Sequence, residues 1–127
     1  FESQTAHQFI MKYVLIAFGG ALGALSRVLI SEALYKATLF SIPFGIISVN
    51  ILGCFLVGLF FESLNSRLEA LVILGFLGAF TTFSAFSKET LQLINDGEVF
   101  VAFLYVFISV GLCLLATWVG MHFAAKA

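Results

Sequence analysis

The feature that most constrains the fold of this chain is a series of long stretches without charged side chains. Residues 44–61 and 70–87 each hold 18 consecutive uncharged residues, and residues 99–125 hold 27 when the histidine is taken as neutral. A fourth stretch is apolar apart from one arginine and one glutamate. A helix needs about 20 predominantly apolar residues to cross a bilayer. The sequence therefore predicts four transmembrane helices, near residues 13–34, 44–62, 70–94 and 99–123.

Composition agrees with a membrane protein and excludes several other classes. Charged residues make up 10% of the chain and hydrophobic residues 61%, whereas a soluble domain carries about 25% charged residues. The net charge of −1 offers no basic surface to nucleic acid. The connections between the predicted helices are short, so nothing remains for a soluble catalytic domain, and we expect no enzymatic activity. The predicted fold class is an all-α membrane protein.

The N-terminal residues are expected to lie apart from the membrane domain. Residues 1–10 precede Met11, which resembles a natural start. We interpret residues 1–10 as an N-terminal extension and residues 11–127 as the four-helix transmembrane domain.

The two cysteines are expected to have a packing role. Cys54 and Cys113 lie inside apolar stretches and lack CxxC spacing. We therefore interpret them as small packing residues, neither disulfide-bonded nor bound to metal.

Positive charges are balanced between the two ends of the predicted bundle. One end carries Lys12, Arg67 and Lys126, and the other carries Arg27, Lys36 and Lys88. The positive-inside rule orients a membrane protein by a bias in such charges. The even count favours insertion in both orientations, after which two opposite copies would pair as an antiparallel dimer. The alternative is a weak bias that a different assignment of one or two charges would reveal.

Polar residues inside the predicted helices are the candidates for function. Arg27 either reaches the headgroups or attracts anions. Asn50, two turns into the second helix, either bonds a neighbouring helix or aims a donor into a polar path. In the last helix a polar stripe recurs every four residues: Tyr105, Ser109, Cys113 and Thr117. The stripe either lines a water path or bonds to its own helix backbone.

The densest group of polar residues lies within the third predicted helix, in the stretch GAFTTFSAFSKE at residues 78–89. Gly, Thr and Ser weaken a continuous helix, so the helix is expected to break near the middle of the membrane, where the freed backbone must line a cavity or be buried. Freed carbonyls can bind a cation and freed amides an anion. Beyond the break, the ring edges of Phe83 and Phe86 and the hydroxyls of Ser84 and Ser87 can meet a small anion.

These motifs together resemble the Fluc (CrcB) family of fluoride channels. GFLGAFTTFSAFSKE is similar to the family signature, GGALGALSR to its glycine-rich first helix, and VNILG to its second-helix asparagine motif. The resemblance implies an antiparallel, dual-topology homodimer in the plasma (inner) membrane. It further implies passive, fluoride-selective conduction that exports cytoplasmic fluoride and relieves fluoride toxicity.

The resemblance also implies roles for individual residues. Together with the patterns above, it assigns ten residues to the fluoride pore: Arg27, Asn50, Thr82, Phe83, Ser84, Phe86, Ser87, Glu89, Tyr105 and Ser109. It implies a structural sodium ion at the dimer centre, held by the backbone carbonyls of Gly78 and Thr81. Cys113 stands where the family often has a hydroxyl, and a thiol is a weaker donor.

Two other classes also fit a short chain with four spans. A small multidrug-resistance-type, proton-coupled transporter needs a carboxylate inside the bundle. The glutamates here lie at or near predicted helix ends: Glu32, Glu62, Glu69, Glu89 and Glu98. A non-transporting assembly subunit would need neither Asn50 nor the hydroxyl stripe. Fluoride efflux from liposomes distinguishes the three classes.

Overall fold

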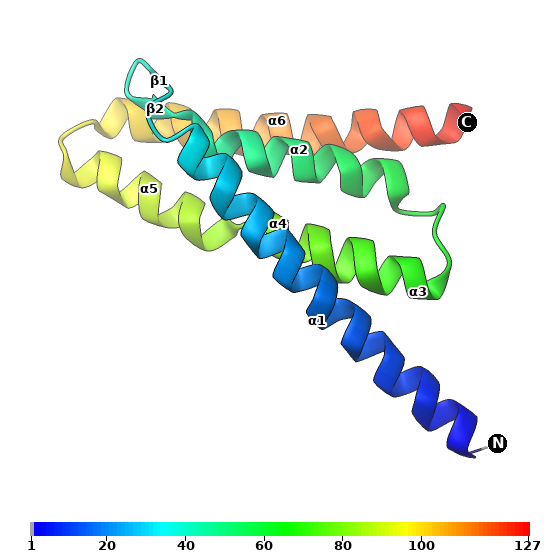
Figure 1. The fold of residues 1–127 in the computed structure, drawn as a ribbon. Helices are drawn as coiled ribbons and strands as arrows, with labels where there is room; N and C mark the ends of the chain where they lie inside the picture. Colours follow the sequence, from blue (N-terminus) through cyan, green and yellow to red (C-terminus); the bar gives the residue numbers. More distant parts are fainter. Residues whose placement is uncertain (1) are drawn as a thin grey trace.

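The computed structural model describes residues 2–127, most of which lie in helices (Figure 1). The helices are α1 (Glu2–Ala33), α2 (Phe44–Phe60), α3 (Ser66–Leu68), the π-helix η1 (Glu69–Leu77), α4 (Gly78–Phe80), α5 (Phe83–Asn95) and α6 (Val99–Lys126). Two antiparallel strands, β1 (Thr38–Leu39) and β2 (Ile42–Pro43), form a short hairpin between α1 and α2. Its turn residues, Phe40 and Ser41, both have positive φ, as the commonest two-residue hairpin turn requires.

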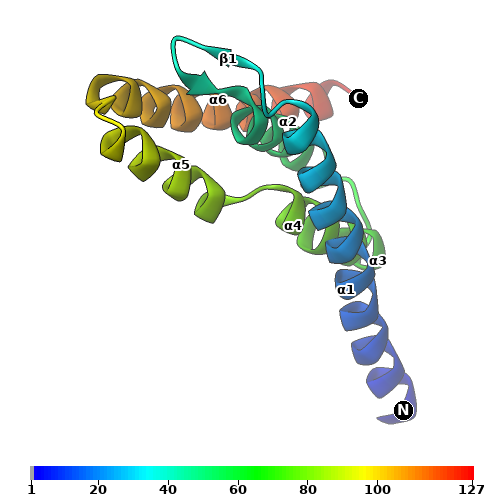
Figure 2. The ribbon, with the colours of Figure 1, turned by 60° about the vertical axis from the view of Figure 1, so that its left-hand side comes forward.

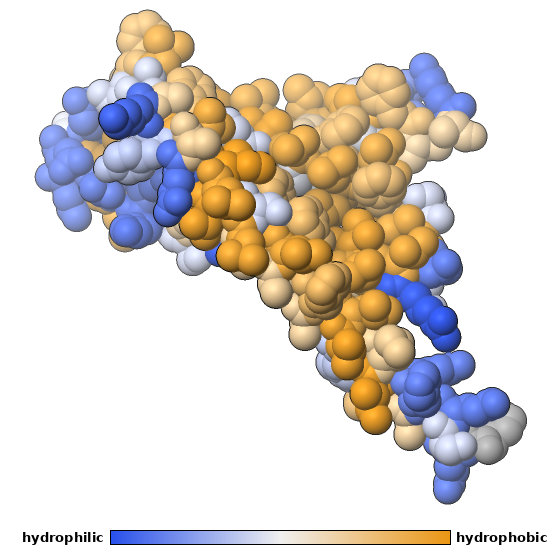
Figure 3. Space-filling model, viewed as in Figure 1, coloured by the Kyte–Doolittle hydropathy of each residue, from blue (hydrophilic) through white to orange (hydrophobic). Residues whose placement is uncertain are grey.

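The helices pass back and forth between two ends of the molecule (Figures 1 and 2). The start of α1, the α2–α3 connection and the C-terminus lie toward one end, and the hairpin and the α5–α6 turn toward the other. Hydrophilic residues gather at both ends, with a hydrophobic band between them (Figure 3). Three segments are long and apolar enough to cross a membrane: Glu2–Ala33, Ser66–Asn95 and Val99–Lys126. The predicted class, an all-α membrane protein, is confirmed, while α2 is a shorter apolar helix of 17 residues.

The first and third predicted helices differ most from the structure in their bounds. The first was expected from residue 13, but α1 already begins at Glu2, so residues 2–10 continue it without interruption. The N-terminal residue lies outside the described part of the chain. The third, expected over 70–94, is divided into α3, η1 and α4 before two extended residues and α5 after them.

The backbones of α1 and η1 touch through glycines. A Cβ on Gly19 would lie 2.1 Å from the carbonyl oxygen of Leu71, and one on Gly23 would lie 2.1 Å from that of Phe76. Small residues four apart allow this approach within a membrane. The π-helical form of η1 is rare in proteins, and where it occurs it is often at a functional site. Hydrophobic periodicity did not predict it, because a mostly apolar run of nine residues looks alike in an α-helix and a π-helix.

The backbones of α2 and α6 also touch through glycines, and the two helices run in the same direction (Figure 1). A Cβ on Gly58 would lie 2.1 Å from the carbonyl oxygen of Thr117, and one on Gly120 would lie 2.3 Å from that of Phe55. Contacts this short tie the two helices in one register.

The buried interior is small. One cluster comprises Ile42, Ile46, Ile47, Phe86, Leu93, Ala102 and Tyr105, and a second comprises Val49, Leu77 and Phe80. Many large apolar side chains remain exposed, including Phe100 and Phe107 on α6. Exposed apolar surface of this extent is typical of contact with lipid or with another subunit.

We expect Gly120→Val to destabilise the purified protein, because the added Cβ would meet the Phe55 carbonyl oxygen at 2.3 Å. Overpacking of this kind costs about 1–3 kcal/mol. Gly111→Val is the matched control, since it lies on the same helix with nothing within 4 Å of an added Cβ. Thermal unfolding in detergent, followed by gel filtration, measures the difference. Equal midpoints for the two variants would contradict the close packing of α2 on α6.

Candidate functional site

The third apolar segment breaks between α4 and α5. α4 ends at Phe80, and Thr81 and Thr82 are extended, with φ/ψ of −80°/151° and −149°/120°. The Thr82 hydroxyl accepts a hydrogen bond from the Ala85 amide at 3.2 Å and so caps α5. The Thr81 hydroxyl donates to the carbonyl four residues earlier, at 3.0 Å. The predicted break is therefore present, and the threonine hydroxyls satisfy part of its backbone.

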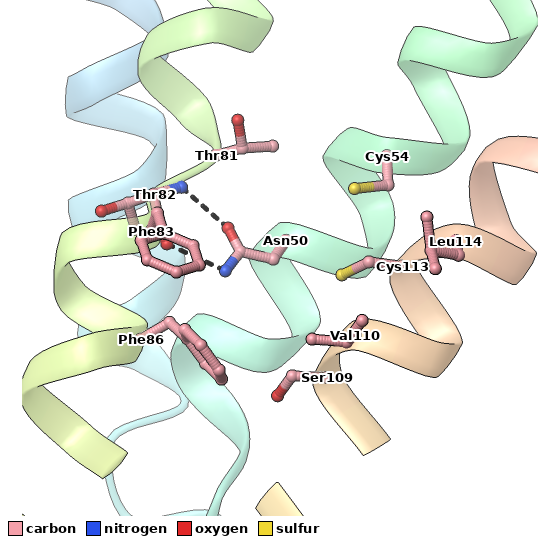
Figure 4. A pocket seen from close by; sticks show the side chains of 10 residues that line it. All are labelled: Asn50, Cys54, Thr81, Thr82, Phe83, Phe86, Ser109, Val110, Cys113 and Leu114. Atoms are coloured by element: carbon pink, nitrogen blue, oxygen red, sulfur yellow. Dashed lines mark hydrogen bonds between the residues drawn. The ribbon is translucent and has the colours of Figure 1, made fainter. Parts of the chain in front are cut away.

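Asn50 on α2 satisfies the backbone of the break from outside. Its Oδ1 accepts from the Thr82 amide at 2.8 Å, and its Nδ2 donates to the Thr82 carbonyl at 3.0 Å (Figure 4). Each of these backbone groups would cost about 1–3 kcal/mol if it were buried without a partner. Nδ2 carries two hydrogens, so one remains for another acceptor.

Arg27 on α1 reaches the same break from another side. Its Nε donates to the Ala79 carbonyl at 3.2 Å, in a partly buried position. The residue therefore bonds within the protein, at the end of a helix whose dipole is negative there. It brings a positive charge to the backbone of α4.

The break diverts the amides that would bond two of the carbonyls before it. In a continuous helix the Thr82 amide would bond to Gly78, but here it bonds to Asn50. The Ala85 amide would bond to Thr81, but here it bonds to the Thr82 hydroxyl. Oxygen atoms of this kind suit a hard cation. Among residues 2–127 there is no cluster of three or more His, Cys, Asp or Glu side chains that would hold a metal.

Aromatic rings lead from the break toward α6. Phe83 is 77% exposed and Phe86 is 8% exposed, and their ring centroids lie 5.4 Å apart with the planes at 52°. Phe86 stacks on Tyr105 of α6, with centroids 5.4 Å apart. The Tyr105 hydroxyl donates a hydrogen bond to Glu89, about one turn beyond Phe86. The rings and this carboxylate form one continuous group between α5 and α6.

A cavity of about 300 Å³ lies between the break, α2 and α6 (Figure 4). It is lined by Asn50, Cys54, Thr81, Thr82, Phe83, Phe86, Ser109, Val110, Cys113 and Leu114. The Ser109 hydroxyl is buried, and no group of residues 2–127 pairs with it. Because buried hydroxyls normally have a partner, Ser109 is available to donate to a ligand.

Two further cavities continue the line of this central cavity along α2. One of about 520 Å³, lined in part by Ile46 and Glu89, lies toward the hairpin. The other, of about 450 Å³, is lined in part by Gly58 and Glu62 at the opposite end of α2. The distance from Ile46 to Gly58 along the helix is about 18 Å at 1.5 Å per residue. The three cavities therefore follow one another in order along α2.

The structure brings half of the predicted pore residues together. Asn50, Thr82, Phe83, Phe86 and Ser109 line the central cavity. Of the others, Glu89 lines the cavity toward the hairpin, Tyr105 is buried beside it, and Arg27 bonds at the break. Ser84 is exposed and shares a hydrogen bond of 3.1 Å with the Thr82 hydroxyl. Ser87 lines none of the three cavities.

Sequence reasoning missed Cys54 as a residue of the site. It follows Asn50 by four residues, and the same spacing that revealed the stripe on the last helix would have placed it on one face with Asn50. The stripe itself divides in the structure. Ser109 and Cys113 face the central cavity, whereas the Thr117 hydroxyl donates to the Cys113 carbonyl at 3.1 Å.

Apolar helices long enough to cross a membrane, with one segment broken beside a cavity that has polar groups in its lining, are typical of membrane channels and transporters. The sequence model of the family described as CrcB-like protein, Camphor Resistance (CrcB), matches residues 14–121. The chain belongs to this family, as the motifs predicted.

Curated relatives match most of the chain and most of their own length. The chain is 46% identical to a protein of Campylobacter lari over 110 aligned residues. The aligned residues make up 83% of this chain and 90% of the relative. It is 43% identical over 117 residues to one of Geobacter sulfurreducens, covering 87% and 94%. It is 44% identical over 117 residues to one of Magnetococcus marinus, covering 87% and 95%. All three are named fluoride-specific ion channel FluC.

We expect Asn50→Leu to lower the free energy of unfolding by about 2–6 kcal/mol, because it leaves both backbone groups of Thr82 unpaired at about 1–3 kcal/mol each. Asn50→Asp keeps an acceptor for the Thr82 amide and should lie between Asn50→Leu and the parent. Asn95→Leu, an exposed position at the end of α5, is the matched control and should stay within about 0.5 kcal/mol. Denaturation in detergent measures the free energy of unfolding of all three variants. If Asn50→Leu leaves it unchanged, the hydrogen bonds from Asn50 do not stabilise the break.

Proposed function

We propose that this protein is a passive fluoride channel, and no enzyme, that lets cytoplasmic fluoride leave the cell and so relieves its toxicity. The observation that carries the proposal is the central cavity, where Asn50, Phe83, Phe86 and Ser109 meet without a charged side chain. Membership of the CrcB family supports it, as do relatives named fluoride-specific ion channels.

Neutral hydrogen-bond donors are the chemistry that fluoride needs in such a path. The ion is small and strongly hydrated, so the protein must replace its water with donors. Asn50 retains one amide hydrogen, and the Ser109 hydroxyl is unpaired among the described residues. Thr82 and Ser84 share one hydrogen bond, which leaves one of their two hydroxyl hydrogens free. Donors without charge hold the ion strongly enough to admit it and weakly enough to release it.

The rings of Phe83 and Phe86 complete this lining. Their planes are inclined at 52°, so they do not stack face to face. The edge of a phenyl ring is electropositive, and an edge turned toward the path attracts an anion without binding it as a cation would. A path narrowed by the rings would favour fluoride over larger anions such as chloride.

A proton-coupled transporter of the small multidrug-resistance type is not favoured. Such a transporter needs a carboxylate at the substrate site inside the membrane. The carboxylate of Glu89 lines the neighbouring cavity instead, where it accepts a hydrogen bond from Tyr105.

Reconstitution into liposomes tests the function directly. We expect fluoride to leave down its gradient without a proton gradient, and chloride to be strongly excluded. Phe83→Ile and Phe86→Ile should each slow fluoride at least about tenfold, because loss of about 1.4 kcal/mol of ring-edge stabilisation at the barrier has that effect. Phe107→Ile, 73% exposed on α6 and outside the cavities, is the matched control. Equal fluoride and chloride fluxes, or an absolute need for a proton gradient, would disprove the proposal.

We further propose that the protein acts as an antiparallel homodimer of four-span subunits in the inner membrane. In the single chain, Phe83 and the Ser84 hydroxyl are exposed in the third apolar segment. A hydroxyl that faces lipid is poorly solvated, and a second subunit over this surface would cover it. The even balance of positive charges between the two ends supports insertion in both orientations.

Labelling of a single new thiol tests the orientation. The labelled protein carries Cys54→Ser, Cys113→Ser and Ala127→Cys. About half of the molecules should react with a reagent confined to one side of the membrane, because equal insertion places half of the C-termini there. Permeabilised vesicles, in which all sites should react, are the control. Labelling of nearly all or nearly none of the sites in sealed vesicles would exclude dual topology.

A structural sodium ion between the two subunits is part of the same proposal. The carbonyls of Gly78 and Thr81 would hold it, because the amides that would bond them in a continuous helix have other partners. A side-chain substitution keeps the carbonyl, so replacement of the ion is the informative experiment. Protein purified in a large organic cation should show a less stable dimer and a lower fluoride flux, and sodium should restore both. If neither responds to sodium, this part of the proposal is wrong.

A further inference from the structure

The two cysteines of the chain, 59 residues apart in sequence, lie together in the structure. Both are free, and both line the central cavity. Cys54 projects from α2 and Cys113 from α6. Figure 4 shows both sulfur atoms turned toward the cavity. Packing alone, the role expected from the sequence, does not explain why two half-buried thiols face one cavity.

The packing of α2 on α6 holds the thiols opposite each other. Gly58 meets the backbone of Thr117, and each cysteine lies four residues, or about one turn, before one member of that contact. Because the helices run in the same direction, the register that joins Gly58 to Thr117 also joins Cys54 to Cys113. Backbones in direct contact cannot slide past one another, so the pair of thiols is held in place without a disulfide bond.

The surroundings of the thiols favour a soft metal ion over a hard one. Val110, Leu114 and Phe86 give the cavity apolar walls. The amide oxygen of Asn50 is already engaged by the Thr82 amide. Hard cations such as magnesium and calcium need several oxygen ligands, whereas thiolates select soft ions. Monovalent silver and copper, and divalent mercury, bind two thiolates in a line and need no further ligand.

We propose that Cys54 and Cys113 form a dithiol site for a soft, thiophilic metal ion, and that occupation of this site blocks the central cavity. When silver binds, two S–H bonds break, two Ag–S bonds form and two protons pass to the buffer, without transfer of electrons. The resulting bis-thiolate complex carries one negative charge. Placed beside Asn50 and Ser109, this charge repels an anion in the cavity. The block rests on the proposed fluoride function, whereas the metal site does not.

Titration with silver nitrate in a buffer free of chloride and thiols tests the site. The purified full-length protein should bind one silver ion per chain and release protons as the thiols ionise. Cys54→Ser and Cys113→Ser should each weaken binding at least about tenfold, and the double variant at least about a hundredfold. The double variant keeps both methionines and both histidines, so it controls for those ligands. No binding by the parent, or equal binding by the double variant, overturns the site.

Fluoride efflux from liposomes tests the block. Silver should slow efflux through the parent at least about tenfold, and dithiothreitol, which removes silver, should restore it. Each variant is compared with its own rate before silver, and the double variant should show no response. Silver that binds the parent but leaves its flux unchanged overturns the block. If the parent carries no fluoride before silver is added, the proposed function fails, and the titration still decides the site.

Discussion

The reciprocal hydrogen bonds between Asn50 and Thr82 are the interaction on which the site depends. A helix broken inside a hydrophobic band exposes amides and carbonyls that lipid cannot satisfy. One carboxamide from α2 satisfies an amide and a carbonyl at once, at 2.8 and 3.0 Å. Because the Thr82 amide is engaged in this way, the chain leaves α4, restarts as α5, and turns Phe83 and Phe86 toward the cavity. The same bonds divert the amide that would otherwise occupy the Gly78 carbonyl.

Close contacts between backbones provide the rigidity that this arrangement needs. Glycines on α1 face η1, and glycines on α2 and α6 face each other, all near carbonyl oxygens. With so few buried side chains, the fold relies on these contacts and on helix–helix hydrogen bonds more than on a large core. Arg27 on α1 also supports the break, through its hydrogen bond to the Ala79 carbonyl. A site built from single donors needs such support, since small shifts would misplace them.

The lining of the central cavity combines hydroxyls, one amide, two thiols and ring edges, and none of these groups is formally charged at neutral pH when the thiols are protonated. In the proposed channel such a lining would let an anion pass without trapping it, because a fixed cation would hold a small anion too strongly. The charged residues Arg27 and Glu89 lie beside the cavity and are each engaged by a hydrogen bond within the protein. The charges therefore flank the path and do not interrupt it.

The sequence by itself determined the membrane class, the approximate spans, the break and most of the residues near it. These are local properties: a run of apolar residues is long enough for a bilayer or it is not, and a cluster of Thr and Gly weakens the helix in which it occurs. The tertiary structure decided the rest: that Asn50 bonds to Thr82, that Arg27 bonds to Ala79, that Ser87 stays away from the cavities, and that Cys54 meets Cys113. It also decided that η1 is a π-helix and that α1 starts at Glu2. The physical reason is that partners on different helices depend on which helices touch and in what register. Direct contacts between distant backbones set that register, and no local pattern in the chain encodes them.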